Sequence, residues 1–360
     1  MASPIGSGNA IISRISDLGR REITLSLFQT MSWQEAWWNE WGREPGVKLL
    51  FPWGEERSGV YLHSYSMNYL LRIHCLQFVG TSYRALSTPR TEYNSLGELS
   101  RLDGVLTKVK EVSWTEAVFS DLDSGTAELN MISKWASENG WYFRYLHSES
   151  TYGINTTDTF RRYLAWLGKS TRLKLYNRRN VLESLGNVTE ENFWPDRTRE
   201  FFELLNEFHL TRWGTPCFND RSLAFHLKFL NRGVAEGVEP LLMVLCNENR
   251  PVSVLYNAFY RGCIYNIQAG FHQSLHPKLA LGTLHLGYAI ESAFQNPSVH
   301  YFDLLAGEGK NTNYKVHLAP DQRSLTTCMV VRSPVFQVLY RVKDLISSLR
   351  GRNSTQSRSV

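Results

Sequence analysis

Three short apolar segments in the second half of the chain constrain the fold more than any other feature. Each segment is either continuously apolar or alternates apolar with polar residues, which is typical of strands. Clusters of Asn, Glu, Arg and Gly separate them and favour tight turns. The sequence therefore predicts an antiparallel meander, with strands at residues 241–246, 252–260 and 264–270.

A loop, a helix and a fourth strand follow this meander. The loop covers residues 271–282, and we expect the helix to begin with Thr283 as its N-cap. Residues 299–305 then form a short, mostly apolar strand that carries one acidic residue, Asp303. A loop that opens a helix beside a sheet can hold a pyrophosphate on the free N–H groups of the helix.

Length and composition limit the class of protein. A chain of 360 residues with 42% hydrophobic residues predicts two domains, each with its own core. The net charge of +5 permits an anionic ligand but does not by itself indicate nucleic acid. The five cysteines have neither CxxC spacing nor paired histidines, which favours reduced thiols in a cytoplasmic protein. No apolar run is long enough for a membrane span, so we expect a soluble protein.

The first half reads as mixed helix and strand. Ser32 and Glu35 have the spacing of a capping box, and Trp33, Trp37 and Trp41 then recur on one face of a helix. We interpret this stripe as core rather than as an exposed binding surface. Strands are predicted at 47–51, 60–65, 69–79 and 141–146, with a helix at 128–138.

A basic segment opens the second half. Residues 169–179 contain five Lys or Arg residues, and a helix through to Gly186 would place Leu173 and Val181 near one face. The cations either face water or clamp a phosphate through Arg172 and Arg178. Spacing alone leaves both interpretations open.

Motifs for several common chemistries are absent. The sequence has no GxSxG elbow, Walker loop, GxGxxG after a strand, or HExxH. No cluster of histidines and cysteines has metal-ligand spacing, so we predict no metal. A transferase that works through backbone amides and positioning remains compatible with this pattern.

Four local strings carry a resemblance to a known family. They are FQTMSW with AWW (28–38), YLAWLGK through RLKLYNRR (163–179), HLTRWG (209–214), and YFDLLAG with YK (301–307 and 314–315). In this order the strings resemble the CelD-type acetyltransferase-like family of the GNAT superfamily, whose relatives are the FemAB-like double-GNAT transferases. The resemblance spans about residues 28–330.

The resemblance implies a mixed α+β protein with two tandem GNAT-like acyltransferase domains. The boundaries we predict are an N-terminal extension at 1–27, domains at 28–152 and 153–345, and a disordered basic tail at 346–360. The second domain is expected to bind acyl-CoA, most simply acetyl-CoA, as a co-substrate. The family's glycine-rich turn corresponds to PKLALG (277–282) here, where Gly282 fits best and Lys278 is placed to contact a phosphate.

The implied reaction is direct attack of an acceptor amine on a thioester carbonyl, which needs a proton acceptor and strict alignment. Asp303 is the first candidate, because a carboxylate in an apolar strand needs either a partner or a task. The alternative is an ion pair with Lys315 or Arg172 that only holds a loop in place. Tyr314 and His209 are further catalytic candidates. The candidate binding residues are Arg172, Arg178, Trp213, Lys278, Gly282, Thr283 and Lys315.

Three functions remain open at this point. The first is an N-acyltransferase that acts on a small-molecule amine, in a sugar, an amino acid or an envelope or polysaccharide precursor. The second is a FemAB-like aminoacyltransferase that uses charged tRNA, the one case in which nucleic acid is a partner. The third is a non-catalytic protein of polysaccharide assembly that retains the fold. The sequence predicts neither the acceptor, nor the acyl length, nor the oligomeric state.

Overall fold

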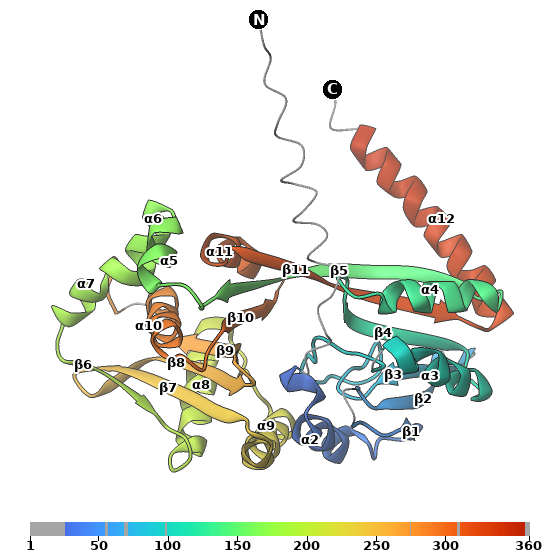
Figure 1. The fold of residues 1–360 in the computed structure, drawn as a ribbon, viewed down its shortest axis with the longest axis horizontal. Coiled ribbons are helices and arrows are strands. Elements are labelled where there is room, and N and C mark those ends of the chain that lie inside the picture. Colours follow the sequence, from blue (N-terminus) through green and yellow to red (C-terminus); the bar gives the residue numbers. More distant parts are fainter. Residues whose placement is uncertain are drawn as a thin grey trace, which may run out of the picture. The chain divides into compact units, whose positions relative to one another are not determined.

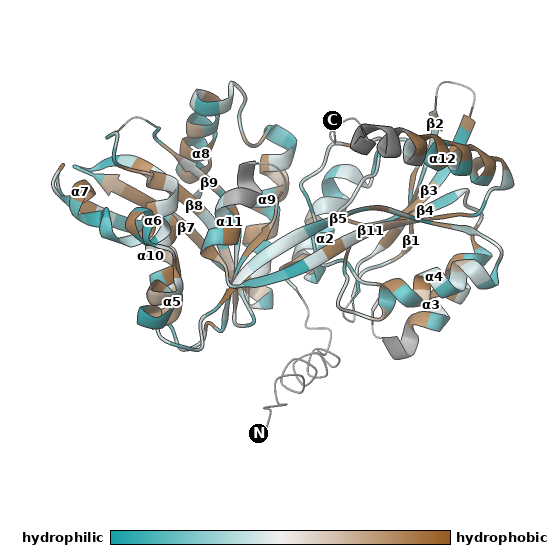
Figure 2. Cartoon of the chain, turned by 90° about the horizontal axis from the view of Figure 1, so that it is seen from above, coloured by the Kyte–Doolittle hydropathy of each residue, from teal (hydrophilic) through white to brown (hydrophobic). Residues whose placement is uncertain are grey.

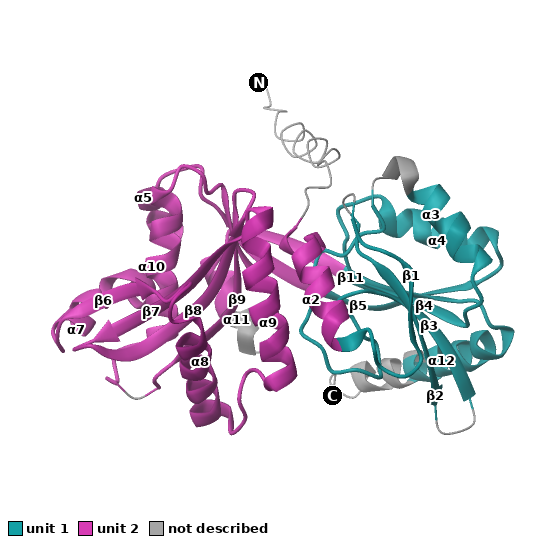
Figure 3. Ribbon diagram, turned by 90° about the horizontal axis from the view of Figure 1, so that it is seen from below, with its two compact units in different colours: residues 1–25, 41–148, 326–360 teal, residues 26–40, 149–325 magenta. Residues whose placement is uncertain are grey.

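A computed structural model describes residues 26–54, 57–67, 71–97, 99–273, 275–307 and 310–356 (Figure 1). Most of the predicted N-terminal extension lies outside these ranges. The chain divides into two compact units (Figure 3). Unit 1 comprises residues 1–25, 41–148 and 326–360, and unit 2 comprises residues 26–40 and 149–325.

Unit 1 is built on strands in the order β1-β2-β3-β4-β11-β5. The β1–β2 and β2–β3 pairs are antiparallel, whereas β3 and β4 are parallel. The elements that contribute to it are β1 (Val47–Phe51), β2 (Val60–Met67), β3 (Leu71–Phe78), α3 (Leu99–Glu111), β4 (Glu116–Asp123), α4 (Glu128–Glu138), β5 (Tyr142–Asn155), β11 (Asp321–Val331) and α12 (Pro334–Gln356).

Both faces of this part of the sheet are covered. Helices α3 and α4 bury one apolar face against it, in a cluster that includes Cys328 and Val330 of β11. The neighbouring residues Met329 and Val331 belong to the opposite cluster, together with Phe336 of α12. Side chains in a strand alternate between faces, so β11 contributes to both cores.

Unit 2 has strands in the order β5-β10-β9-β8-β7-β6. The β9–β10 pair is parallel, and the other pairs with a described register are antiparallel. Its strands and longer helices are β6 (Val188–Asn192), α8 (Thr198–Trp213), α9 (Asp220–Gly233), β7 (Glu239–Asn247), β8 (Arg250–Tyr260), β9 (Cys263–Phe271), α10 (Leu281–Gln295), β10 (Tyr301–Ala306) and α11 (Lys310–Leu318). Its shorter helical segments are η2 (Leu27–Gln29), α5 (Phe160–Trp166), α6 (Lys169–Arg172), η3 (Leu173–Asn177), α7 (Arg179–Glu183) and η4 (Val234–Glu236).

The predicted meander and its two turns are confirmed. Strands β7, β8 and β9 contain the three predicted segments. Glu248, Asn249 and Arg261 adopt positive φ angles of 50°, 60° and 46° in the turns between them. The tryptophan stripe in α2 (Met31–Trp41) is core, since Trp33, Trp37 and Trp41 are all at most 2% exposed.

Two predicted helix starts are wrong. The capping box involves Ser26 and Gln29, which start the short 3₁₀ turn η2, rather than Ser32 and Glu35. At the start of α2, the backbone N–H groups of Met31 and Ser32 donate to the Glu236 carboxylate instead, at 2.8 and 2.6 Å. Helix α10 begins at Leu281 with Ala280 as a cap without a side-chain bond, so Thr283 lies inside its first turn.

The basic segment is not one regular helix. A π-helical turn, η3, separates α6 from α7. The π turn shifts the helical register, so Leu175 and Leu182 are fully buried and Leu173 is exposed, contrary to the predicted face. Leu175 packs against Gly287 of α10, where an added Cβ would lie 2.1 Å from the Leu175 carbonyl oxygen.

The compact units differ from the sequential boundaries in two segments. Residues 26–40 group with unit 2, and residues 326–360 group with unit 1. Helix α12 also continues through Gln356, into the region that the sequence predicts to be a disordered tail. Among the described residues, no helix combines the length and apolar character that a membrane crossing requires.

Candidate functional site

Strands β9 and β10 stop pairing part-way along their length. Their parallel register runs from Tyr301 opposite Cys263 to Asp303 opposite Tyr265. Beyond this point β9 continues to Phe271, while β10 makes an irregularity against β5 between Asp303 and Ala306. Leu305 lies in this irregularity with a φ of 60°, a value that few side chains adopt. The strands therefore part immediately after Asp303.

Asp303 is held at this point by the backbone. Its side chain is buried, and its Oδ1 atom accepts a hydrogen bond from the Leu305 N–H at 2.7 Å. This bond stabilises the unusual conformation of Leu305, so the carboxylate has a structural task. Burial is the main cause that raises the pKa values of the Cys263 thiol and the Tyr265 hydroxyl well above their usual range, and the Asp303 charge raises both further.

Lys315 anchors the same end of β10. Its side chain is buried, and Nζ donates to the carbonyl oxygens of Leu305 and Ala306 at 3.0 and 2.9 Å. Lys315 lies in α11, so these bonds tie α11 to the strand irregularity. Lys315 therefore holds the end of β10 in position.

The end of α8 meets β9 beyond the point where its pairing with β10 stops. His209 Nε2 donates to the Ala269 carbonyl at 3.0 Å, which leaves Nδ1 as the ring atom with a lone pair. Burial, and secondarily Arg212, lowers the pKa of His209, while the bond to Ala269 raises it. The imidazole is therefore neutral near pH 7 and able to accept a proton at Nδ1.

Arg212 places a positive charge beside the end of β9. Its guanidinium carbon lies 4.7 Å from the Trp213 ring centre and 4.6 Å from that of Phe271. Burial raises the pKa of the Tyr314 hydroxyl, and the nearby Arg212 charge lowers it, so Tyr314 lies close enough to sense this cation. Arg212 and Trp213 both belong to the sequence string HLTRWG. The sequence predicted a binding role for Trp213 but not for Arg212.

Phe271 also connects this cluster to the start of α10. A Cβ on Gly282 would lie 2.4 Å from the Phe271 ring, so a side chain at position 282 would require this ring to shift. The first helical hydrogen bond is from Leu284 to Ala280, at 2.9 Å. The N–H groups of Leu281, Gly282 and Thr283 therefore have no acceptor within the helix. His209, Arg212, Phe271, the first turn of α10, and Tyr314 form what we call the β9-end cluster.

Two arginines that were predicted to bind a ligand, Arg172 and Arg178, lie outside the β9-end cluster. Arg172 donates from Nη1 to the Leu164 carbonyl at 3.4 Å, and Arg178 lies between η3 and α7. No contact described here joins either arginine to the β9-end cluster. Lys278 is exposed in the loop before α10, and its backbone N–H donates to His276.

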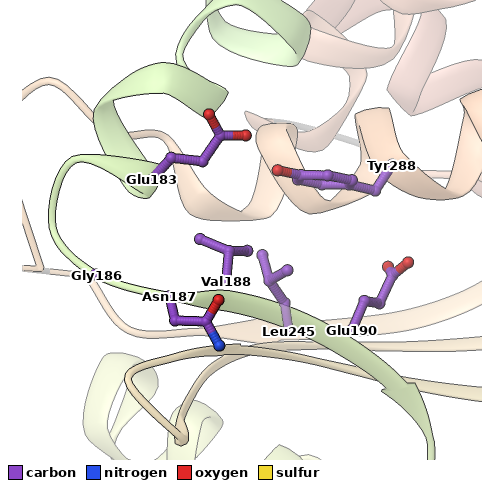
Figure 4. Close-up of a pocket in the computed structure, with 7 residues that line it drawn as sticks. All are labelled: Glu183, Gly186, Asn187, Val188, Glu190, Leu245 and Tyr288. Carbon is purple, nitrogen blue, oxygen red and sulfur yellow. The ribbon is translucent and has the colours of Figure 1, made fainter.

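A pocket of about 440 Å³ lies between α7, β6 and α10 (Figure 4). In the figure the Tyr288 hydroxyl and the Glu183 carboxylate point toward each other above Val188 and Leu245. Burial raises the pKa of Tyr288, Arg179 lowers it, and Glu183 and Glu190 raise it further. The lining residues are Glu183, Gly186, Asn187, Val188, Glu190, Leu245 and Tyr288. None of them was predicted as a site residue.

Buried polar contacts support one wall of this pocket. His285 Nε2 lies 3.1 Å from Glu190 Oε1, and its Nδ1 lies 2.9 Å from Ser253 Oγ. Ser253 Oγ also donates to the Gly270 carbonyl at 3.2 Å. Ser253 is fully buried, so this Ser-His-Glu chain links α10 to the sheet rather than presenting a nucleophile.

Comparison with known proteins identifies the segment that carries this site. Residues 169–316 match the family described as Acetyltransferase (GNAT) domain. The match covers the β9-end cluster, the β9–β10 parting and the pocket. A search of curated proteins gave no match to this chain.

Solved structures extend the likeness beyond that segment. The crystal structure of FemX has a TM-score of 0.55 at 11% identity, covering 88% of this chain and 94% of that one. A conserved protein of unknown function from Bacteroides thetaiotaomicron VPI-5482 gives 0.50 at 12% identity, covering 89% and 96%. At these identities the likeness shows the fold alone. It confirms the predicted mixed α/β class.

The residues fit an anionic donor better than a metal. Among the described residues, no group of three or more His, Cys, Asp or Glu side chains is placed to hold a metal ion. The uncapped first turn of α10 offers three N–H donors, and Arg212 reaches its neighbour Phe271. A helix N-terminus with a nearby cation is the arrangement that binds phosphate groups.

Proposed function

We propose that this protein is an N-acyltransferase that moves an acyl group, most simply acetyl, from acyl-CoA to an amine. One observation carries the proposal. The GNAT-domain match contains both the parting of β9 from β10 after Asp303 and the uncapped first turn of α10. From the CelD-type resemblance we propose that the acceptor is an amine of a sugar, an amino acid, or an envelope or polysaccharide precursor. We also propose that the reaction takes place in the cytoplasm. The resemblance also makes unit 1 a second GNAT-like domain.

Donor binding is assigned to the start of α10. The N–H groups of Leu281, Gly282 and Thr283 would hold the pyrophosphate, and Lys278 would add a positive charge. Bound there, acyl-CoA supplies an activated carbonyl with a good leaving group. Arg212 and Trp213 border the same place, and Trp213 is exposed enough to cover a ligand.

Proton transfer is assigned to groups around the parted strands. The acceptor nitrogen must lose a proton as it attacks, and Asp303, or His209 through Nδ1, is the acceptor. Tyr314 relays or donates a proton to the leaving group, and Lys315 keeps the end of β10 in place. Arg172 and Arg178 remain proposed contacts to a phosphate on the acceptor, as the basic segment predicts.

The second candidate is FemAB-like aminoacyl transfer from charged tRNA. The structural likeness to FemX is the observation in its favour. The third is a non-catalytic role in polysaccharide assembly. The incomplete glycine turn, in which Gly282 packs under Phe271, is the observation that favours it.

Ligand-induced thermal shift separates the three. The purified chain is mixed with acetyl-CoA, a long-chain acyl-CoA or bulk charged tRNA, and its melting temperature is measured. We expect acetyl-CoA to raise it, since binding at 100 times Kd adds about 2.7 kcal/mol to stability. A shift with charged tRNA alone would support the second candidate, and no shift with any of them the third.

Two variants locate the binding. Lys278→Ala should weaken acetyl-CoA binding by about tenfold, the scale of one hydrogen bond to a charged group. Lys174→Ala removes an exposed lysine from η3 and should leave the affinity unchanged. Equal affinity in both variants would show that Lys278 makes no donor contact.

A further inference from the structure

Helix α12 carries an apolar face that nothing described in the structure covers. The residues on this face recur at spacings of three and four along the helix, and each is 45% to 63% exposed. Figure 2 shows the brown residues along the helix. The α12 face consists of Val335, Val338, Leu339, Val342, Leu345, Ile346 and Leu349.

The opposite side of α12 is the side that packs on unit 1. Phe336 and Tyr340 are buried there, and Arg144 pairs with Asp344 at 2.6 Å. With 3.6 residues per turn, the α12 face spans an arc of about 120° and runs about 21 Å from Val335 to Leu349. It therefore points away from the core of unit 1 along its whole length.

Positive charge borders this face on both sides. On a helical projection Arg341 lies beyond one edge and Lys343 beyond the other, and both are exposed. The only acidic residue between 334 and 356 is Asp344, which lies on the inward side in its pair with Arg144.

The charges decide between two occupants. A second copy of α12 would bring cationic edges against cationic edges, with no acidic residue on the helix free to complement them. An anionic lipid surface complements both the apolar face and its basic borders. Long basic side chains beside an apolar stripe can also reach the headgroups while the stripe enters the acyl region.

We propose that α12 binds an anionic membrane surface, lying in the plane of the interface with the α12 face inserted. The helix attaches to the surface and does not cross the bilayer. This inference does not depend on the acyl-transfer reaction. It adds a membrane surface to the partners of the protein.

Vesicle co-sedimentation tests the proposal with the full chain. Vesicles of phosphatidylcholine with one-quarter phosphatidylglycerol are compared with pure phosphatidylcholine vesicles at 0.1 M salt. We expect at least tenfold tighter binding to the anionic vesicles, and a marked loss at 0.5 M salt because exposed charges are screened.

Substitutions at two exposed valines, Val338 at 63% and Val234 at 50% exposure, provide the comparison. Val338→Glu places an acid on the α12 face, while Val234→Glu does so at an exposed valine in η4 of unit 2. Val338→Glu should lower vesicle binding at least tenfold with an unchanged melting temperature, and Val234→Glu should bind as the parent does. Lys343→Glu should weaken binding to anionic vesicles alone.

Three results would overturn the proposal. The first is no binding of the parent chain to anionic vesicles. The second is equal binding of the parent and Val338→Glu. The third is a dimer of the parent in sedimentation velocity that Val338→Glu dissociates, since a second copy would then cover the face.

Discussion

Asp303 combines a structural bond with a position at the proposed reaction site. Its Oδ1 atom holds the Leu305 N–H at 2.7 Å where β9 and β10 part. Asparagine can keep this bond through its own Oδ1 atom, but it cannot accept a proton or carry the charge. The two roles of Asp303 can therefore be separated by substitution.

We expect Asp303→Asn to lower turnover on the order of 10²-fold or more, with donor affinity nearly unchanged. Asp303→Ala should in addition lower the free energy of unfolding by about 1–3 kcal/mol, because the Leu305 N–H loses its acceptor. Turnover is measured as release of free CoA thiol, and stability by urea unfolding. If the carboxylate only pairs with Lys315, Asp303→Asn should lower stability, and removing the Lys315 charge should partly restore it. An Asn variant with parental activity and stability would move the search to His209 and Tyr314.

His226 predicts how stability depends on pH. It is buried among aromatic rings, its Nδ1 lies 3.2 Å from the Tyr256 hydroxyl, and Nε2 has no hydrogen-bond partner in the part of the chain that the structure describes. Burial lowers the pKa of His226 to about 3. The folded protein keeps this ring neutral, whereas the unfolded chain takes up a proton below its ordinary pKa of about 6.5.

The His226 contribution to stability is therefore fully present above pH 6.5 and is lost as the pH falls toward 3. Between pH 7 and pH 5 the loss is on the order of 2 kcal/mol. We expect His226→Gln to remove this part of the pH dependence, measured by urea unfolding at both pH values. His147→Gln, at an exposed position in β5, should retain it. A parental pH dependence in His226→Gln would contradict the assignment.

The sequence predicted some of these residues and not others. Asp303 was predictable because a lone acid in an apolar strand needs a partner or a task. Phe271 was not, because its importance comes from contacts with Arg212 and Gly282, which lie far from each other in sequence. The pocket residues Glu183, Glu190 and Tyr288 come from three separate elements and share no sequence motif.

At the scale of elements, the contact between η3 and α10 depends on one glycine. A Cβ at Gly287 would lie 2.1 Å from the Leu175 carbonyl oxygen and 2.9 Å from Leu175 Cγ. Backbone atoms cannot move away as a flexible side chain can. The π turn and α10 therefore fit together only while this position has no side chain.

Gly287→Ala should lower the free energy of unfolding by about 1–3 kcal/mol, the usual cost of overpacking. Gly104→Ala is the matched control, because Gly104 lies in α3 and an added Cβ meets no atom within 4 Å. There alanine should raise stability by up to about 1 kcal/mol through its higher helix propensity. Both changes are measured by urea unfolding. Equal changes in the free energy of unfolding for the two substitutions would show that η3 and α10 can move apart without loss of stability.

Strand and helix positions followed from periodicity, whereas helix starts did not. The meander was predictable because alternation and turn residues act over a few neighbours. The start of α2 depends on Glu236, about two hundred residues away. The start of α10 has no side-chain cap, so no capping residue marks it in the sequence. The π turn likewise reflects packing on Gly287, which no local pattern in the basic segment records.

At the scale of the whole chain, the two units are not consecutive in sequence. Residues 326–360 return to unit 1 after the chain has built unit 2, and residues 26–40 belong to unit 2. Sequence reasoning gave two mixed domains but assigned them consecutive ranges. Strand β11 lies between β4 and β5, although it is far from both in sequence. The residues around β11 therefore do not indicate which strands it pairs with.

This connectivity predicts the effect of truncation. A chain that ends after Leu325 lacks the part of β11 that belongs to unit 1, and with it Cys328 and Val330 from one core cluster and Met329 and Val331 from the other. We expect residues 41–148 to become sensitive to trypsin, while 149–325 stays resistant. A chain that ends after Leu349 keeps β11, Phe336 and Tyr340, and should digest like the full chain. Mass spectrometry of the fragments measures both. Residues 41–148 that stay equally resistant in the shorter chain would show that unit 1 folds without its last strand.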